Sequence, residues 1–167
     1  MRRASLLAAL AAAALVAGCG GSGHPASTSS TAAIGKGAFV TRADAICTAS
    51  KTALAPVLAR ETATLEAKPP KRAAAATALE QASTIVAGGL AKLKALPQPG
   101  AQRSLLATVY RALGEEAETL HKLAADVRAG RTKAMSTDAS EQDAFSTLYT
   151  GAAETFGFKR CGARAGS

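Results

Sequence analysis

Hydrophobic residues recur every three or four positions from Ala38 to Phe156, which is the spacing of an amphipathic α-helix. Three short stretches break this pattern, at residues 66–72, 96–100 and 129–131, and each contains proline or glycine. Such stretches are typical of turns between helices. The pattern therefore predicts four amphipathic helices, each of about 24–29 residues, with short turns between them.

The apolar positions of each expected helix indicate which residues should form the core. They are Phe39, Ala43, Ile46, Leu54, Val57 and Leu65 in the first helix; Leu79, Ala82, Val86, Leu90 and Leu93 in the second; Leu106, Val109, Leu113, Ala117, Leu120, Ala124 and Val127 in the third; and Ala134, Phe145, Leu148, Ala152 and Phe156 in the fourth, where the acidic Asp138 also stands on the same stripe. The polar residues Ser50 and Glu61 interrupt the first set, whereas the third set is unbroken. Gly157 follows the last set and is expected to end the fourth helix.

Some residues are expected to make these helices irregular. Pro56 has no N–H donor, so it should kink the first helix or split it near residues 52–55. The glycine pair at 88–89 weakens the second helix by about 1 kcal/mol per glycine relative to alanine. Asp138 and Glu141 resemble a capping box, so the fourth helix could begin as late as Asp138.

Four amphipathic helices joined by short turns predict an all-α fold, an up-down-up-down four-helix bundle. The first helix would then begin, and the fourth would end, at the same end of the bundle. Many of the core positions are alanine, which allows helices to approach closely but buries little apolar area per residue. Such a thin core gains from a covalent cross-link. The bundle domain is expected to span residues 38–167.

The first 18 residues have the organisation of a secretory signal peptide. Arg2 and Arg3 form a basic start, and residues 6–17 form an uncharged apolar stretch. As a helix, this stretch would rise about 18 Å, whereas the hydrocarbon core of a membrane is about 30 Å thick. A permanent membrane span is therefore not expected.

Val16, Ala17, Gly18 and Cys19 follow this apolar stretch, and they resemble the lipobox of bacterial lipoproteins, although leucine is more common where Val16 stands. The resemblance implies cleavage before Cys19, a diacylglycerol group on its sulfur, and anchoring to the outer face of the cell membrane. A plain secreted protein with an incidental cysteine is the alternative. Residues 19–37 are rich in Gly, Ser, Thr and Ala, so we expect them to be a lipidated, flexible tether.

If Cys19 carries a lipid, Cys47 and Cys161 remain as an even pair in a compartment that permits disulfides. They stand 114 positions apart, so a bond between them would close a loop worth about 4–5 kcal/mol in the chain-entropy model. In the expected topology the two sulfur atoms can meet if the tail after Gly157 folds back along the first helix. Two free thiols are the alternative.

Two motifs at the ends of the domain resemble those of a group of small actinobacterial lipoproteins. Residues 39–47, FVTRADAIC, contain the AD-x-IC pattern that opens the first helix in that group, and residues 157–162, GFKRCG, match its short G-[apolar]-K-x-CG tail. The resemblance covers the two ends of the domain and not its middle. It implies a Cys47–Cys161 disulfide that ties the first helix to the C-terminal tail, and it implies no particular activity.

The best pattern for a chemical site is Glu118-x-x-His121, which resembles one half of a di-iron site in a four-helix bundle. Such a site needs a second motif of this kind and two further glutamates, and the other histidine, His24, lies in the tether. Glu118 and Lys122 have the spacing of an exposed ion pair, and Glu116 is expected on the same solvated face. Glu118 and His121 are therefore weak metal candidates, and no cofactor is expected.

No set of residues predicts catalysis, so the chain is not expected to be an enzyme. There is no G-x-S-x-G turn, no C-x-x-C pair and no glycine-rich phosphate loop. Asp44 stands near Cys47 and near the start of the first helix, where a carboxylate favours the helix dipole. We expect Asp44 to have this structural role.

The chain is basic, with 20 Lys and Arg against 12 Asp and Glu, a net charge of +8 that falls to +6 once Arg2 and Arg3 leave with the signal peptide. This charge suits anionic lipid or cell-wall polymer as partners. There is no Trp and no nucleic-acid-reading motif, so nucleic acid is not an expected partner. Basic clusters at 68–72 and 159–164 are expected at opposite ends of the bundle, mainly as solvated loop charges, with the second near the membrane.

Two functions fit these features. The first is a lipid-anchored, non-enzymatic interaction module of the cell envelope with an unknown protein partner. The alternative is a carrier of a small molecule or metal, with a pocket inside the bundle where Pro56 and the glycine pair at 88–89 loosen the packing. A carrier predicts a cavity lined by the first and second helices, whereas an interaction module predicts a solid core and an exposed apolar patch.

Overall fold

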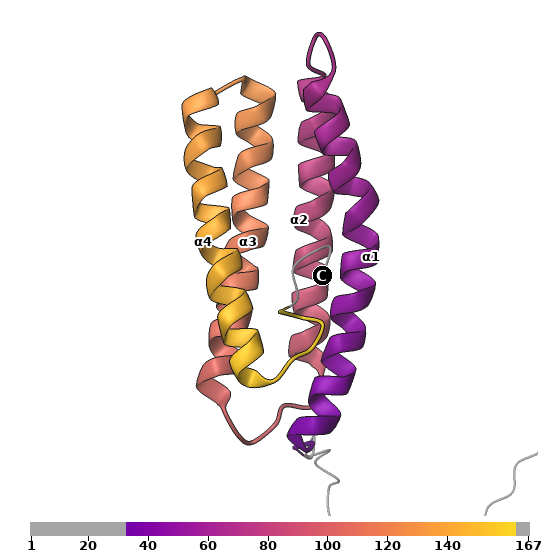
Figure 1. Ribbon diagram of the computed structural model, residues 1–167, viewed down its shortest axis with the longest axis vertical. Helices are drawn as coiled ribbons and strands as arrows, with labels where there is room; N and C mark the ends of the chain where they lie inside the picture. Colours follow the sequence, from indigo (N-terminus) through magenta and orange to yellow (C-terminus); the bar gives the residue numbers. More distant parts are fainter. Residues whose placement is uncertain (1–32, 163–167) are drawn as a thin grey trace, which may run out of the picture. The chain divides into compact units, whose positions relative to one another are not determined.

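The computed structural model describes residues 33–162, which form a bundle of four α-helices (Figure 1). The helices are α1 (Lys36–Glu66), α2 (Arg72–Ala95), α3 (Arg103–Ala129) and α4 (Thr132–Phe156), and the described residues contain no strand. Successive helices run in opposite directions, so α1 begins and α4 ends toward the same end of the bundle (Figure 1). The predicted all-α, up-down-up-down bundle is confirmed.

Glycines end the last two helices. Gly130 follows α3 with a φ of +68°, and Gly157 follows α4 with a φ of +101°. Residues with a side chain rarely adopt this left-handed conformation. At Gly157 it turns the chain so that the backbone N–H donates to the carbonyl oxygens of Ala153 and Glu154 at the end of α4. The predicted end of the fourth helix at Gly157 is confirmed.

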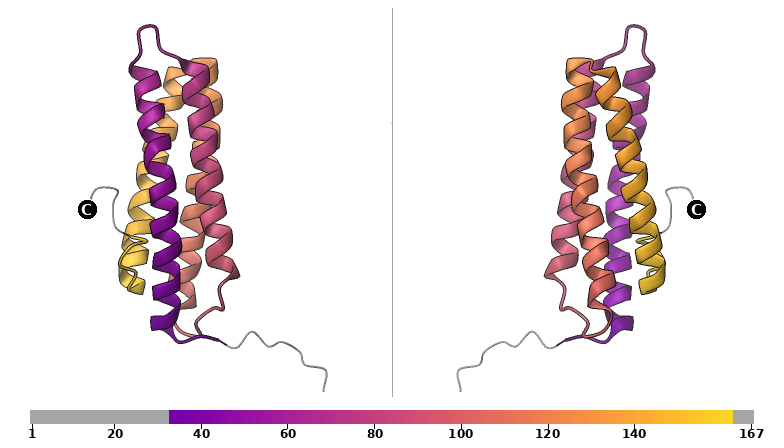
Figure 2. Two further views of the ribbon diagram at one scale, coloured as in Figure 1. Left: turned by 90° about the vertical axis from the view of Figure 1, so that its right-hand side faces the viewer. Right: turned by 90° about the vertical axis from the view of Figure 1, so that its left-hand side faces the viewer.

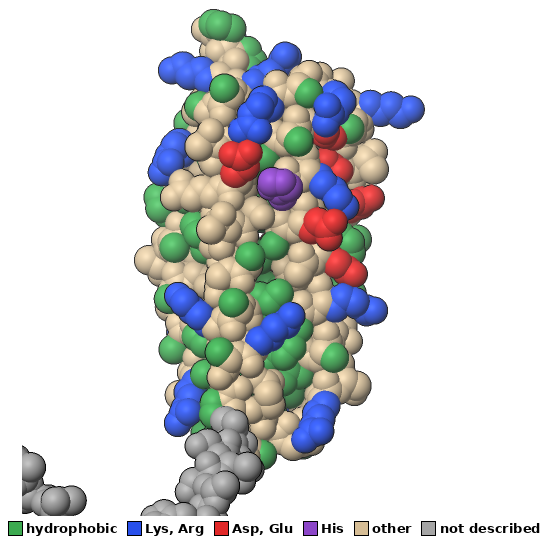
Figure 3. Space-filling view, turned by 180° about the vertical axis from the view of Figure 1, so that it is seen from behind, with side chains coloured by type: hydrophobic (Ala, Val, Ile, Leu, Met, Phe, Trp, Pro, Cys, Tyr) green, Lys and Arg blue, Asp and Glu red, His purple; other side chains and the backbone are tan. Residues whose placement is uncertain are grey.

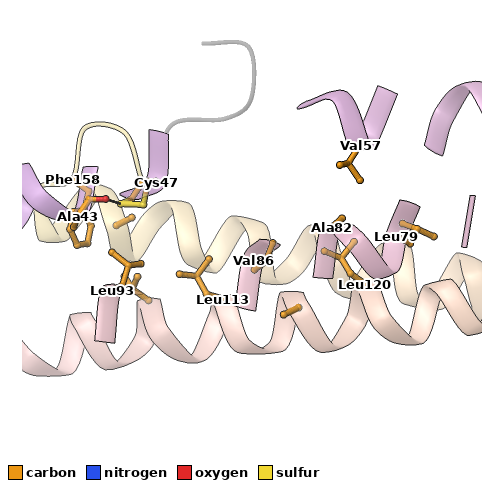
Figure 4. Packing of buried hydrophobic residues seen from close by; sticks show 14 of the residues in the cluster. Ala43, Cys47, Val57, Leu79, Ala82, Val86, Leu93, Leu113, Leu120 and Phe158 are labelled. Carbon is orange, nitrogen blue, oxygen red and sulfur yellow. Dashed lines mark hydrogen bonds between the residues drawn. A yellow bond between two sulfur atoms is a disulfide. The ribbon is translucent and has the colours of Figure 1, made fainter. Parts of the chain in front are cut away.

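The core is most complete between α2 and α3. All of the predicted core positions of α3 are buried, and those of α2 are buried except for the partly buried Leu90. Figure 4 shows this packing for Leu79, Ala82, Val86 and Leu93 of α2 and for Leu113 and Leu120 of α3. These two helices form the best-packed wall of the bundle.

α1 differs from its expected form at two places. It begins at Lys36, two residues before Ala38, and its first hydrogen bond runs from the Phe39 N–H to the carbonyl oxygen of Gly35. It also continues through Pro56 without a break, so the expected split near residues 52–55 is wrong. Pro56 lies on the exposed side of the helix, where water can hydrogen-bond the carbonyl group that the proline leaves without a donor.

α4 begins earlier than the capping-box pattern indicated. The carbonyl oxygen of Arg131 already accepts the N–H of Met135, so the first turn forms directly after Gly130 and Asp138 lies inside the helix. The predicted core position Leu148 is wrong, because its side chain is 41% exposed. Of the other helices only α3 packs closely against α4, so the buried stripe of α4 is narrower than its apolar pattern.

Asp138 is a buried acid, and one of its carboxylate oxygens has no hydrogen-bond partner. Burial raises the pKa of this carboxyl above its ordinary value, and the charges of Asp126 and Glu141 and a hydrogen bond with Asp126 raise it further, while Lys122 acts against them. Ionised Asp138 is therefore destabilising in the folded state. The penalty is complete above the folded pKa and disappears below the unfolded pKa of about 3.9.

We therefore expect Asp138→Asn to raise the free energy of unfolding at pH 7, with a gain that shrinks as the pH falls toward 4. Urea unfolding measured at several pH values checks this result. Asp143→Asn, on the exposed side of the same helix, is the control and should change little. A gain for Asp138→Asn that grows toward low pH would contradict the prediction.

The four helices do not form a closed ring. α2 packs against α1 and α3, and α3 packs against α4, but the Cα atoms of α1 and α4 stay more than 8 Å apart. The segment after α4 lies on this open side of the bundle, as the two side views show (Figure 2). The link between the first and last helices is therefore made by side chains and by the C-terminal tail.

Candidate functional site

A disulfide joins Cys47 of α1 to Cys161 of the tail, with a Cα–Cα distance of 5.0 Å. Both cysteines are buried, Cys161 completely. The carbonyl oxygen of Ala43 lies 3.5 Å from the Cys161 sulfur (Figure 4). The predicted pairing of first helix and tail is confirmed, and the tail does fold back along α1.

Asp44 holds the same tail through hydrogen bonds. Its carboxylate accepts the backbone N–H groups of Lys159, Arg160 and Cys161 at distances of 2.8–3.2 Å. The expected role of Asp44, as a partner of the dipole of its own helix, is wrong. α1 begins at Lys36, so Asp44 stands more than two turns inside the helix and instead binds a segment over 110 residues away.

We expect Asp44→Asn to lower the free energy of unfolding of the oxidised protein by about 1–2 kcal/mol. The asparagine amide keeps one acceptor oxygen, but its NH₂ group faces the backbone N–H donors of the tail and cannot accept from them. The change also removes charge-assisted hydrogen bonds, which are worth about 1.5–3 kcal/mol each when they are well shielded from water. Urea unfolding gives the loss, with Asp143→Asn as control. Hydrogen exchange at residues 159–161 should also become faster, and unchanged exchange there would contradict this role.

Three phenylalanines close the end of the bundle beside the disulfide. Phe39 of α1 and Phe156 of α4 meet edge to face with ring centroids 5.9 Å apart, and Phe158 of the tail stacks on Phe156 at 4.7 Å. Phe39 and Phe156 are completely buried. The ammonium group of Lys36 lies 5.1 Å from the centre of the Phe156 ring. This cluster connects α1, α4 and the tail.

A cavity of about 220 Å³ lies beside this cluster, where α1 and α4 do not pack together. Its apolar lining comes from Ile46, Leu54 and Leu58 of α1, Val86, Leu90 and Leu93 of α2, and Leu113 of α3. α4 contributes Ser146, Tyr149 and Thr150, and the disulfide forms part of the wall. A cavity of about 150 Å³ suffices to hold benzene, so this space can take a small apolar molecule.

The cavity does not have the origin that the sequence suggested. Pro56 is exposed and does not line it. Gly89 does line it, but this glycine allows close packing, because a Cβ atom there would lie 2.7 Å from the Ser50 hydroxyl oxygen of α1. The space exists because α1 and α4 remain apart while the tail joins their ends.

Glu116 and Tyr149 are the titratable groups on the α3 and α4 walls of the cavity. Burial raises the pKa of the Glu116 carboxyl, and burial together with the charges of Glu116 and Asp44 raises the pKa of the Tyr149 phenol. The Tyr149 hydroxyl lies 3.8 Å from the Cys47 sulfur. A disulfide sulfur carries no proton, so the hydroxyl is the donor in this contact.

The metal candidates lie away from the cavity. Glu118 and His121 are exposed, and Glu118 forms an ion pair of 3.4 Å with Lys122. Figure 3 shows the histidine on the face opposite to that of Figure 1, among acidic and basic side chains. Within residues 33–162, no three His, Cys, Asp or Glu side chains come together as metal ligands. This geometry supports the solvated ion pair that the spacing indicated.

Cys19, the expected lipidation site, lies outside the described residues, as does the end of the basic cluster at 159–164. The described part of that cluster follows α4, and the cluster at 68–72 lies between α1 and α2 at the other end of the bundle (Figure 1). Among the described helices, none has a stretch long and apolar enough to cross a membrane.

The expectation that Glu116 lies on the solvated face is wrong, because it lines the cavity, and the sequence interpretation did not single out Tyr149, which lines it as well. Glu116 did leave a signal, because it follows Leu113 by three positions and precedes Leu120 by four, which places it on the inward stripe of α3. Tyr149 stands next to the wrongly chosen Leu148, and nothing in the sequence indicated the shift. No family model matches the chain, and neither a curated protein nor a solved structure shows significant similarity to it.

Proposed function

We propose that this protein is a lipid-anchored carrier of the cell envelope that binds a small, largely apolar molecule in the cavity between α1 and α4. The observation that carries the proposal is the cavity itself, about 220 Å³ with seven large aliphatic side chains in its lining. Ligand sites are typically concave and mostly apolar, with a few polar groups that fix orientation. The cavity has both kinds of lining.

The cavity supports one of the two functions that fit the sequence more than the other. A carrier was expected to have a space lined by the first and second helices, and six of the aliphatic lining residues belong to α1 and α2. An interaction module was expected to have an exposed apolar patch. Among the described residues, the exposed large hydrophobic side chains are Leu58 and Leu148, at 38% and 41%. The apolar cavity and the small number of exposed large hydrophobic side chains therefore favour the carrier over the interaction module.

The anchoring part of the proposal rests on the leader and on the lipobox-like residues that end in Cys19. A disulfide between Cys47 and Cys161 agrees with it, because such bonds persist outside the cytosol. The tether at residues 19–37 would keep the carrier near the membrane surface, and the net positive charge would favour anionic lipid or cell-wall polymer around it. Growth with a radiolabelled fatty acid tests the anchor: label should enter the wild type and be absent from Cys19→Ala.

Octan-1-ol is a suitable first probe of the cavity, because it is neutral, unbranched and small. It has about nine non-hydrogen atoms, and a binding free energy of about 0.5 kcal/mol per atom corresponds to a Kd on the order of 1 mM. The protein for this test is residues 19–167 with Cys19→Ser, which contains all of residues 33–162 that form the helical bundle. We expect amide NMR shifts concentrated on the cavity-lining parts of α1, α2 and α4.

A matched pair of variants on α4 shows whether the cavity is the site. Ser146→Trp places a large side chain in the cavity wall, and Ser140→Trp places the same side chain at an exposed position of the same helix. The proposal predicts that Ser146→Trp abolishes octanol binding and that Ser140→Trp retains it. Octanol that shifts no resonances, or that binds both variants equally, would overturn the carrier proposal.

A further inference from the structure

The Glu116 carboxylate is an unusual group for a cavity whose other α3 and α2 lining is aliphatic or glycine. Among the ion pairs and hydrogen bonds within residues 33–162, none includes this carboxylate. Burial is the cause of its raised pKa, and no neighbouring cation lowers it. A half-buried acid without a cationic partner is costly, and an occupant of the cavity that supplies a cation would remove that cost.

The cationic group nearest the cavity is already engaged elsewhere. Lys51 of α1 lines the cavity, but its ammonium group donates to the carbonyl oxygen of Arg160 in the tail at 2.6 Å. Burial lowers the pKa of Lys51, the charge of Arg160 lowers it further, and the Asp44 carboxylate acts against both. The Lys51 charge therefore belongs to the set of contacts that holds the tail, whereas the Glu116 charge faces the cavity.

Tyr149 adds a second acceptor to the same space. Its hydroxyl proton is directed to the Cys47 sulfur, so the phenol oxygen offers its remaining lone pair to a ligand. Glu116 lines the same cavity, and burial first and the charge of Glu116 second raise the pKa of the Tyr149 phenol. A carboxylate and a hydroxyl oxygen together form a pair of acceptors that suits a head group with several N–H donors.

We propose that the molecule carried in the cavity is a cationic amphiphile, with a protonated amine paired to Glu116 and an apolar body packed against the leucines of α1 and α2. This inference rests on the proposed carrier function and names the ligand class of the same site. Charged hydrogen bonds inside an apolar site are stronger than in water, so the amine would fix both the affinity and the orientation of the ligand. The net charge of residues 19–167 is +6, the value left when Arg2 and Arg3 are removed, and it opposes non-specific binding of cations elsewhere on the chain.

The test compares three probes with the same alkyl chain, octylamine, octan-1-ol and octanoate, at pH 7 in moderate salt. Titration calorimetry with residues 19–167 (Cys19→Ser) gives the Kd of each probe. We expect octylamine to bind at least tenfold more tightly than octanol, and octanoate to bind more weakly than either. Glu116→Gln should remove most of this preference and bring the Kd of octylamine to within about twofold of the Kd that the same variant shows for octanol.

Glu118→Gln is the matched control, because Glu118 lies on the same helix but is exposed and does not line the cavity. This variant should keep the full preference for octylamine. Equal binding of octylamine and octanol by the wild type, a preference for octanoate, or an amine preference that survives Glu116→Gln would each overturn the cationic ligand and leave the carrier intact. Binding of none of the three probes would overturn the carrier function itself.

Discussion

Replacing both Cys47 and Cys161 with serine lowers the free energy of unfolding by about 4–5 kcal/mol, which is the largest effect that we expect from any change to this chain. The disulfide joins residues 114 positions apart, and the stabilisation from restricting the unfolded chain grows with loop length. Domains are typically stable by about 5–15 kcal/mol, so this is a large share of the total. No close helix packing between α1 and α4 is present to take over the link.

Urea unfolding followed by circular dichroism measures this loss in the oxidised protein. The reduced wild type is a useful control, because it should unfold at nearly the same urea concentration as the double serine variant. The variant itself should not respond to a reducing agent. If the oxidised wild type and the variant unfold at the same urea concentration, the disulfide contributes nothing and the prediction is wrong.

Phe156→Ala is expected to lower the free energy of unfolding by about 3–5 kcal/mol, the usual cost of removing a buried aromatic ring. Phe156 is completely buried and its ring meets those of Phe39 in α1 and Phe158 in the tail, so it connects α4 with both segments. Contacts between aromatic rings add about 0.5–1.5 kcal/mol per pair to the value of burial. The lost ring therefore weakens the link between α1, α4 and the tail.

Phe145→Ala is the matched control for this substitution. Phe145 lies on the same helix, but its side chain is only partly buried and it is not part of the core cluster. Its truncation should cost at most about 1 kcal/mol. Thermal and urea unfolding of both variants, with the disulfide intact, compare the two positions. Equal losses would show that the three-ring cluster has no special role.

The sequence predicts the buried residues of a helix best where that helix has close neighbours on several sides. α3 lies between α2 and α4, and its apolar residues at steps of three and four are all buried. α4 has one closely packed neighbour, and there the apolar pattern is wider than the buried face, so Leu148 is misassigned. The expected split of the first helix at Pro56 is wrong for a related reason. Pro56 lies on the exposed side of α1, and the low helix propensity of proline does not depend on which side of the helix it occupies.

The site is harder to predict because its parts come from distant segments. The pairing of Cys47 with Cys161 can be predicted, because only these two of the three cysteines remain once Cys19 is set aside as the expected lipidation site. Asp44 contacts backbone amides of the tail, and any sequence would supply such amides, so no residue type marks the contact. The cavity depends on the distance between α1 and α4, and the hydrophobic pattern of each helix is the same whether or not that space is filled.

The packing order of the helices also has a consequence for how the chain folds. Each closely packed pair of helices consists of neighbours in the sequence, α1 with α2, α2 with α3, and α3 with α4. Such contacts need only short loops to close, and chains dominated by them fold rapidly. The contacts of Asp44 and Cys47 with the tail span more than 110 residues and carry a much larger entropic cost of closure. The helices should therefore assemble first as a series of local hairpins, and the two ends of the chain, with the wall of the cavity between them, should join last.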